Sequence, residues 1–285
     1  MFCNWGSSFW NPTEHVLEAE VFLSKTGTIE ELAHCRHKDN WKLDVIVTLM
    51  LMLICDPNCE DQSLDPEGKE KDALNKFMFP CLQTVQQKGV TSKMNSWIAK
   101  VRKRVMSLSN NAATHDIRYG VVHDCNEHED LDLLDIFFRG GWSFEGETSA
   151  FSYANRRHGI MRAMRALNGY HDLEQIVAQL SMDEVELNLS EVEKKQFMNF
   201  EASLFSRLPN SSKPGDLLYS FRRVLMAVLL EKLPEILDDL KKMGATACHD
   251  VLFDVVKRNL HTYHFGMNDF KSWSKLVSFC RRVLI

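Results

Sequence analysis

Three short segments decide how this chain is interpreted: Thr114-His115-Asp116-Ile117-Arg118-Tyr119-Gly120, then Phe138-Arg139-Gly140-Gly141-Trp142, then Phe151-Ser152-Tyr153. His115 and Arg118 are three positions apart, a spacing that places both on one face of a helix. None of these residues is informative alone, because a Trp or Tyr usually packs and a His or Arg on a helix is usually solvated. Their order and spacing point to one shared site.

A His-x-x-Arg pair followed at these distances by a Trp and a Tyr resembles the active site of the tyrosine recombinases, the phage-integrase family. The sequence Arg-Gly-Gly-Trp-Ser-Phe-Glu-Gly at 139–146, with Phe-Ser-Tyr shortly after it, is most similar to the recombinases of eukaryotic Crypton-type DNA transposons. The resemblance covers about residues 15–170. It implies site-specific cleavage and rejoining of DNA through a 3′-phosphotyrosyl intermediate.

The resemblance assigns a role to each of five residues. Tyr153 is the expected nucleophile, because a tyrosine hydroxyl can attack a phosphodiester and hold the DNA end covalently. Arg118 is expected to clamp the attacked phosphate, since a guanidinium offers a rigid pair of donors. The resemblance further implies that His115 assists proton transfer, that Trp142 donates its indole N–H, and that Lys25 protonates the departing 5′ oxygen.

The family also has an earlier catalytic arginine, and residues 1–35 contain none; the first arginine is Arg36. We therefore expect a catalytic domain that is incomplete at its N-terminus, with weak or no activity by itself. Two alternatives stay open. One is a non-catalytic DNA-binding module with the same fold. The other is a helical protein-interaction module. Either module would be derived from a transposon.

The net charge of −5 does not favour binding to nucleic acid, but the basic residues are unevenly distributed. One group precedes the His-x-x-Arg pair and another follows Tyr153. Five of these residues are candidate DNA contacts: Lys93, Lys100, Arg104, Arg156 and Arg157. The implied partners are double-stranded DNA and further copies of the chain on it, with no nucleotide and no membrane. The transposon resemblance implies a nuclear location; without it, the expectation is cytoplasmic.

No metal or other cofactor is expected. His34, Cys35 and His37 lie close together, but no second ligand pair follows at the spacing of a zinc finger. His123 and His128 lie among acidic residues, in a stretch that we interpret as a solvated loop. The eight cysteines form no disulfide framework and the N-terminus has no signal-peptide pattern, so free thiols in a reducing compartment are expected.

The pattern predicts a mainly α fold with a small N-terminal β-hairpin or sheet. A strand is predicted at 15–24, with a turn at 25–28 and a buried helix from Trp41 to Cys55 that Asn40 caps. Residues 1–170 would form the recombinase-like domain and 171–285 an all-helical extension. Further helices are expected at about 72–87, from 91, from 115, and at 172–180, 189–207, 215–243, 246–261 and 268–284.

Overall fold

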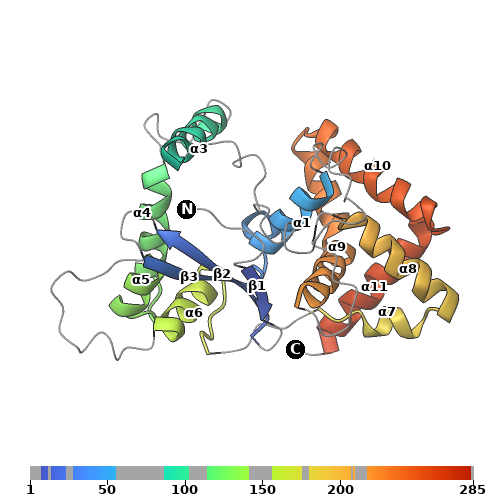
Figure 1. Cartoon of the computed structure of the whole chain (residues 1–285), viewed down its shortest axis with the longest axis horizontal. Helices are drawn as coiled ribbons and strands as arrows, with labels where there is room; N and C mark the ends of the chain where they lie inside the picture. Colours follow the sequence, from blue (N-terminus) through green and yellow to red (C-terminus); the bar gives the residue numbers. More distant parts are fainter. Residues whose placement is uncertain are drawn as a thin grey trace. The chain divides into compact units, whose positions relative to one another are not determined.

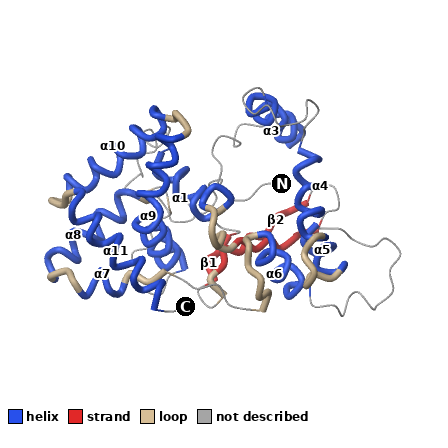
Figure 2. Tube along the Cα trace, turned by 180° about the vertical axis from the view of Figure 1, so that it is seen from behind, coloured by secondary structure: helices blue, strands red, loops and turns tan. Residues whose placement is uncertain are grey.

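The computed structural model is mainly helical, with one small sheet close to the N-terminus (Figures 1 and 2), and this confirms the predicted fold class. Within the described part of the chain, no helix is both long and apolar enough to cross a membrane. The residues that the structure describes are 8–11, 14–23, 28–55, 87–102, 114–140, 156–174, 180–206, 208 and 217–283.

The sheet contains three antiparallel strands in the order β1-β2-β3: β1 (Ser8–Asn11), β2 (Val16–Leu23) and β3 (Thr28–His34). Apolar and acidic residues alternate through much of β2, as the sequence predicted for a strand. The four residues between β2 and β3 include Lys25, so two neighbouring strands flank the position expected for a hairpin lysine.

The chain divides into two compact units. The first unit comprises residues 1–8, 18–33 and 75–175, and the second comprises 9–17, 34–74 and 176–285. The change near residue 175 lies close to the expected boundary at 170. The second unit, however, also takes in two segments that we expected in the N-terminal domain, residues 9–17 and 34–74.

The helices described in the first unit are α3 (Gln87–Arg102), α4 (Thr114–Asn126), α5 (Leu133–Gly140) and α6 (Arg156–Leu167). Helices α4, α5 and α6 pack together around Cys125, Ile136 and Ala163. Helix α6 ends in a glycine turn: Gly169 adopts φ 80°, and the N–H of Tyr170 donates to the carbonyl of Arg165 at 3.0 Å. Glycine adopts this left-handed backbone without a steric penalty.

Helix α9 (Leu217–Lys242) is the centre of the second unit, because α1, α8, α10 and α11 all pack on it (Figure 1). Residues 224–230 are buried around the whole circumference of the helix, as expected for a core helix. The surrounding elements are a 3₁₀ turn (Trp41–Leu43), α1 (Val45–Cys55), α7 (Asp183–Leu187), α8 (Glu191–Leu204), α10 (Thr246–Thr262) and α11 (Met267–Val283).

Two local predictions need correction. Asn40 caps only the 3₁₀ turn, and it is Asp44 that caps α1, accepting from the N–H of Ile46 at 2.8 Å. The predicted helix at 172–180 is wrong for residues 172–174, which are not helical; residues 175–179 lie outside the described part, and the next helix is α7.

Candidate functional site

The described elements of the first unit carry or flank all five candidate catalytic positions. Strands β2 and β3 flank the connection that contains Lys25. Helix α4 carries His115 and Arg118, with helical backbone at both positions, as their spacing requires. Helix α5 ends just before Trp142, and α6 begins three residues after Tyr153.

The side chains of these five residues are not part of the described structure. Lys25, Trp142 and Tyr153 lie outside the described residues altogether. For His115 and Arg118 the structure describes the backbone only. The convergence of the five side chains on one phosphate therefore stays a prediction.

The structure describes the side chains of two of the five candidate DNA contacts. Lys100 is exposed on α3, as a phosphate-binding lysine must be. Arg157 is different: its guanidinium binds the carboxylate of Glu18 on β2 through two hydrogen bonds, one of them at 2.8 Å (Nη1 to Oε2). Of the remaining three, Lys93 and Arg156 have only their helical backbone described, and Arg104 lies outside the described residues.

Arg157 is half-exposed while Glu18 is almost buried, their side chains being 46% and 9% exposed. This pair joins β2 to α6 within the first unit. A buried carboxylate requires a partner, so part of the charge of Arg157 is already compensated in the free protein.

A second arginine on α6 is the centre of a small ionic cluster. Arg162 Nε donates to Asp135 Oδ2 of α5 at 2.9 Å, and its other nitrogens donate to Glu174 and to the carbonyl of Asp130. The hydrogen bond to Asp135 is the main reason that the pKa of Arg162 is raised. Arg165 is buried and donates to the carbonyl of Leu173 at 2.7 Å. These two residues of the basic run thus have structural partners.

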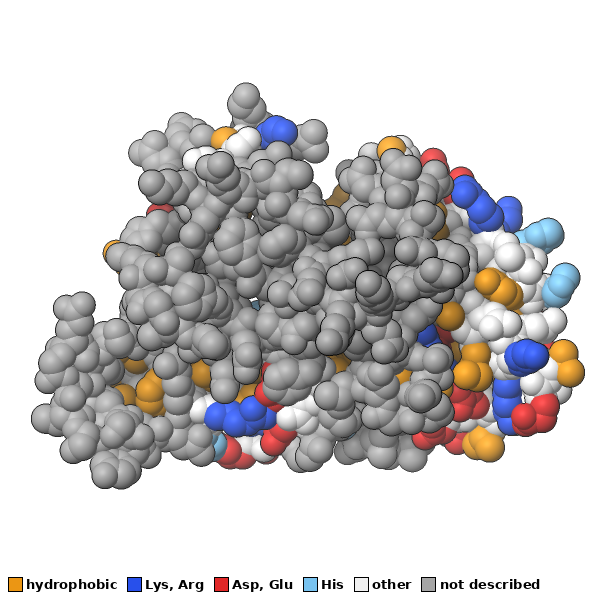
Figure 3. Space-filling view, viewed as in Figure 1, with side chains coloured by type: hydrophobic (Ala, Val, Ile, Leu, Met, Phe, Trp, Pro, Cys, Tyr) orange, Lys and Arg blue, Asp and Glu red, His pale blue; other side chains and the backbone are white. Residues whose placement is uncertain are grey.

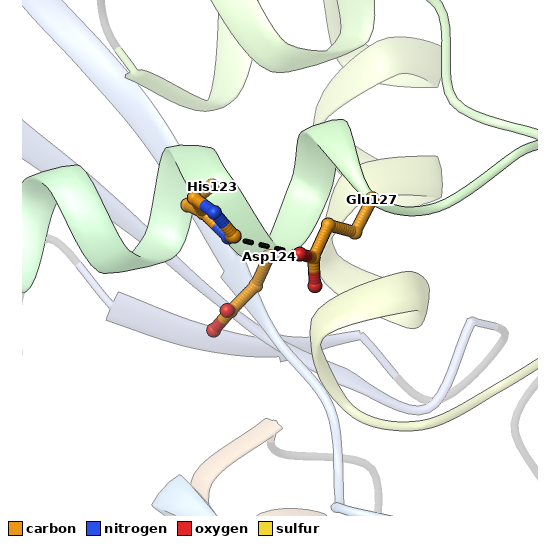
Figure 4. A group of neighbouring side chains, drawn as sticks. All are labelled: His123, Asp124 and Glu127. Atoms are coloured by element: carbon orange, nitrogen blue, oxygen red, sulfur yellow. Dashed lines mark ion pairs between the residues drawn. The ribbon is translucent and has the colours of Figure 1, made fainter.

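One group of possible metal ligands is found in the described residues, at the C-terminal end of α4. It consists of His123, Asp124 and Glu127, whose ligand atoms lie within 4.8 Å of one another (Figure 4). His123 was expected in a loop, but it is helical, and its Nδ1 pairs with Glu127 Oε1 at 3.4 Å. All three side chains are exposed, and exposed carboxylates beside a histidine are common without a metal ion, so we do not assign a metal centre here.

The cluster at residues 34–37 has a structural role in the second unit. His37 Nδ1 accepts hydrogen bonds from the N–H groups of Asp39 and Asn40, at 3.2 and 3.0 Å, so this nitrogen is occupied. Arg36 is buried and pairs with Asp44 at 3.3 Å and with Glu231 at 2.8 Å. Burial raises the pKa of Asp44 even though Arg36 opposes the shift.

The ionic core of the second unit was not predicted from the sequence. Glu201 on α8 is 1% exposed, and it accepts from Arg222 at 2.9 Å and from Arg223 at 2.8 Å. Arg223 also binds Glu186 and lines a polar cavity of about 460 Å³ together with Tyr219 and Ser181. Figure 3 shows described Lys and Arg side chains lying among Asp and Glu on the visible face of the C-terminal helices. In the part described, that face therefore carries positive and negative side chains together and is not a purely basic surface.

Comparison with known proteins gives no match: no family model, no curated protein and no solved structure is found to be similar to this chain. The recombinase resemblance therefore rests on the residues quoted above and on the elements that carry them.

Proposed function

We propose that the first unit is a tyrosine recombinase-like catalytic domain that binds double-stranded DNA and forms a 3′-phosphotyrosyl bond at Tyr153. The observation that carries the proposal is the order and spacing of His115, Arg118, Trp142 and Tyr153. Lys25, between two paired strands of the same unit, adds the position that a general acid would occupy.

In the proposed reaction the hydroxyl oxygen of Tyr153 attacks the scissile phosphorus, and the bond from phosphorus to the 5′ oxygen breaks. The hydroxyl proton passes to a base, for which His115 is the candidate, and Lys25 supplies a proton to the departing oxygen. Arg118 and the indole N–H of Trp142 stabilise the charge that gathers on the non-bridging oxygens. Rejoining is the same step in reverse: a different 5′ hydroxyl attacks the phosphotyrosyl bond and releases Tyr153. The energy of the phosphoester bond is kept in the covalent intermediate, so no nucleotide is needed.

The assembly belongs to the same proposal. Exchange of strands between two DNA sites needs more than one active site, so we propose a homo-oligomer on DNA, in the nucleus. Electrostatic attraction would depend on the basic residues of α3 and α6 rather than on the net charge of −5.

Residues 1–35 contain no arginine that could act with Arg118 on the phosphate, and this favours low activity. The loss of one donor to the transition-state oxyanion costs about 2.7–4 kcal/mol in comparable enzymes, or a factor of about 10² to 10³ in rate. A second candidate function follows from this deficit: a DNA-binding module of the same fold that has lost its chemistry.

A covalent-adduct assay tests the catalytic proposal. The protein is incubated with a pool of nicked duplexes of randomised sequence, in which the cleaved end diffuses away, and protein–DNA adducts are separated under denaturing conditions. We expect a slowly accumulating adduct that Tyr153→Phe abolishes while DNA binding persists. Tyr119→Phe is the matched control, because Tyr119 is 64% exposed on α4 of the same unit, and it should leave the adduct unchanged.

Each other outcome has a defined meaning. An adduct that survives Tyr153→Phe rejects Tyr153 as the nucleophile. Salt-dependent DNA binding with no adduct supports the non-catalytic module. Absence of DNA binding at low salt, together with a stable dimer, rejects both functions and supports a helical protein-interaction module.

A further inference from the structure

An apolar cavity in the second unit contains two thiols. The cavity has a volume of about 400 Å³, and its wall includes Trp41, Leu51, Ile236 and Leu252 together with Cys55 and Cys248. Cys55 is the last residue of α1, and Cys248 lies in the first turn of α10. These two helices pack against each other. Two residues far apart in sequence are thereby brought to the same cavity.

The two thiols differ in their exposure to solvent. Cys248 is exposed, whereas Cys55 is partly buried. Burial raises the pKa of Cys55 to about 11, and the neighbouring Cys248 adds to the shift. This electrostatic effect agrees with the position of both sulfurs at one cavity. At neutral pH, Cys55 is therefore a protonated and poorly reactive thiol.

We propose that Cys55 and Cys248 are a modification site: a thiol pair that a hydroperoxide oxidises reversibly to a disulfide joining α1 to α10. The proposal is independent of the DNA chemistry suggested for the first unit.

The steps balance as follows. The exposed sulfur of Cys248 attacks the peroxide, which gives a sulfenic acid at Cys248 and releases one molecule of water or alcohol. The sulfur of Cys55 then attacks the sulfenic sulfur, and the S–S bond forms as the S–O bond breaks. The hydroxyl group leaves as water and takes the proton of the Cys55 thiol. The peroxide is reduced by two electrons, and a reduced dithiol of small molecular size reverses the change.

The other two thiols whose burial is described are poor substrates for this chemistry. Cys35 is 0% exposed and Cys125 is 1% exposed, so a dissolved oxidant does not reach them. Burial raises the pKa of Cys125 to about 11 as well. The exposure of Cys248 to solvent thus distinguishes the Cys55–Cys248 pair from the buried thiols of Cys35 and Cys125.

The disulfide would have a structural consequence. It would close a long loop of chain, from the end of α1 to the start of α10, and cross-links that close long loops restrict the unfolded state most. The oxidised protein should therefore unfold at a higher temperature than the reduced protein.

The test is peptide mapping of the full chain by mass spectrometry, without reduction, after brief exposure to a small excess of hydrogen peroxide. We expect a cross-linked pair of peptides containing Cys55 and Cys248, lighter by two hydrogen atoms than the separate peptides and lost on treatment with dithiothreitol. Cys248→Ser and Cys55→Ser should each remove it. Cys125→Ser is the control and should leave it.

A second probe covers the case in which Cys55→Ser disturbs folding. Phenylarsine oxide binds tightly to two neighbouring thiols and weakly to one. The wild-type protein should bind it at this pair, and Cys248→Ser, which changes an exposed residue, should lose that binding. Over-oxidation of Cys248 with Cys55 left reduced would overturn the proposal, and so would a cross-link from Cys248 to another cysteine.

Discussion

The two units use arginine differently. In the second unit Arg222 and Arg223 are 10% and 14% exposed, and both bind a glutamate that is itself 1% exposed. In the first unit Arg162 and Arg157 are 21% and 46% exposed, and the Glu174 partner of Arg162 is 57% exposed. A phosphate cannot compete for a guanidinium that is sealed with its carboxylate, but it can reach one that borders on solvent. Arg222 and Arg223 are therefore structural, as is the buried Arg165 of the first unit, whereas the half-exposed Arg157 is open to approach by a phosphate.

The apolar cores of the two units also differ in how completely their described side chains are buried. Helix α9 is buried on all sides over residues 224–230. The α4–α5–α6 cluster has three fully buried members, and it is completed by side chains that are only partly buried: Val121, Val122, Leu131 and Leu167. Among the described residues, the second unit therefore contributes more buried apolar side chains than the first.

The largest predicted effect comes from breaking the buried ionic core. Glu201→Ala leaves Arg222 and Arg223 without their shared carboxylate, and the unpaired charges should cost about 3–5 kcal/mol of unfolding free energy. Urea denaturation followed by circular dichroism measures the loss. Glu174→Ala, which removes an exposed partner in the first unit, should cost less than about 1 kcal/mol. Equal costs would remove the contrast between the units.

The second prediction concerns the contact between α5 and α6. A methyl group at Gly159 would lie 2.8 Å from Phe138 Cδ2, 2.9 Å from Asp135 Oδ1 and 3.2 Å from the Asp135 Cα. Gly159→Ala should therefore destabilise the first unit by about 1–3 kcal/mol. Gly120→Ala is the matched control, because no described atom outside its own stretch of helix lies within 4 Å of the added methyl, and it should stabilise α4 by up to about 1 kcal/mol.

A third, smaller effect tests the start of α8. Ser190 caps this helix and exchanges hydrogen bonds with Glu193, so Ser190→Ala should cost about 1 kcal/mol in thermal or urea unfolding. The bonds from Ser190 also lower the pKa of Glu193 below 4.5. A carboxyl group whose pKa is lower in the folded state stabilises the fold at every pH above its pKa in the unfolded state. This stabilisation is lost as the pH falls through the pKa of the folded state. The wild-type advantage over Ser190→Ala should accordingly shrink below about pH 4.5; an advantage that grows in acid would contradict this.

The smallest effect tests whether Arg157 is available to DNA. Glu18→Gln keeps the shape of the partner and removes its charge, which weakens the pairing of Arg157 with β2 and leaves more of its charge for a phosphate. Binding to duplex DNA should tighten. One added phosphate contact should also make the slope of log K against log salt concentration steeper by about 0.9. Fluorescence anisotropy at several salt concentrations measures this. An unchanged slope would mean that Arg157 serves only to pair β2 with α6.

Local patterns predicted much of the fold. The alternation in β2, the short connection that holds Lys25 and the glycine that ends α6 are each encoded within a few residues. Longer-range features were not predictable in this way. Glu18 pairs with Arg157, which lies 139 residues later in the chain. Residues 34–74 belong to the same unit as the helices after residue 176.

The candidate site shows the same limit. Spacing indicated which residues share a helix, and α4 places helical backbone at His115 and Arg118. It did not indicate that Arg157 and Arg162 already have carboxylate partners, because a basic run in the sequence looks the same whether its charges are paired or free. Nor did it identify Glu201, since a buried glutamate is recognised only by the arginines that surround it.

The central claim is that Arg118 in the first unit contacts DNA phosphate. The most direct measurement is the affinity of the full chain for a random-sequence duplex over a range of salt concentrations, for the wild type, Arg118→Ala and Arg258→Ala. Arg258 is an exposed arginine on α10 of the second unit. We predict that Arg118→Ala weakens binding and lowers the salt slope by about 0.9, while Arg258→Ala changes neither. Absence of salt-dependent binding, or an equal loss in both variants, would contradict the account.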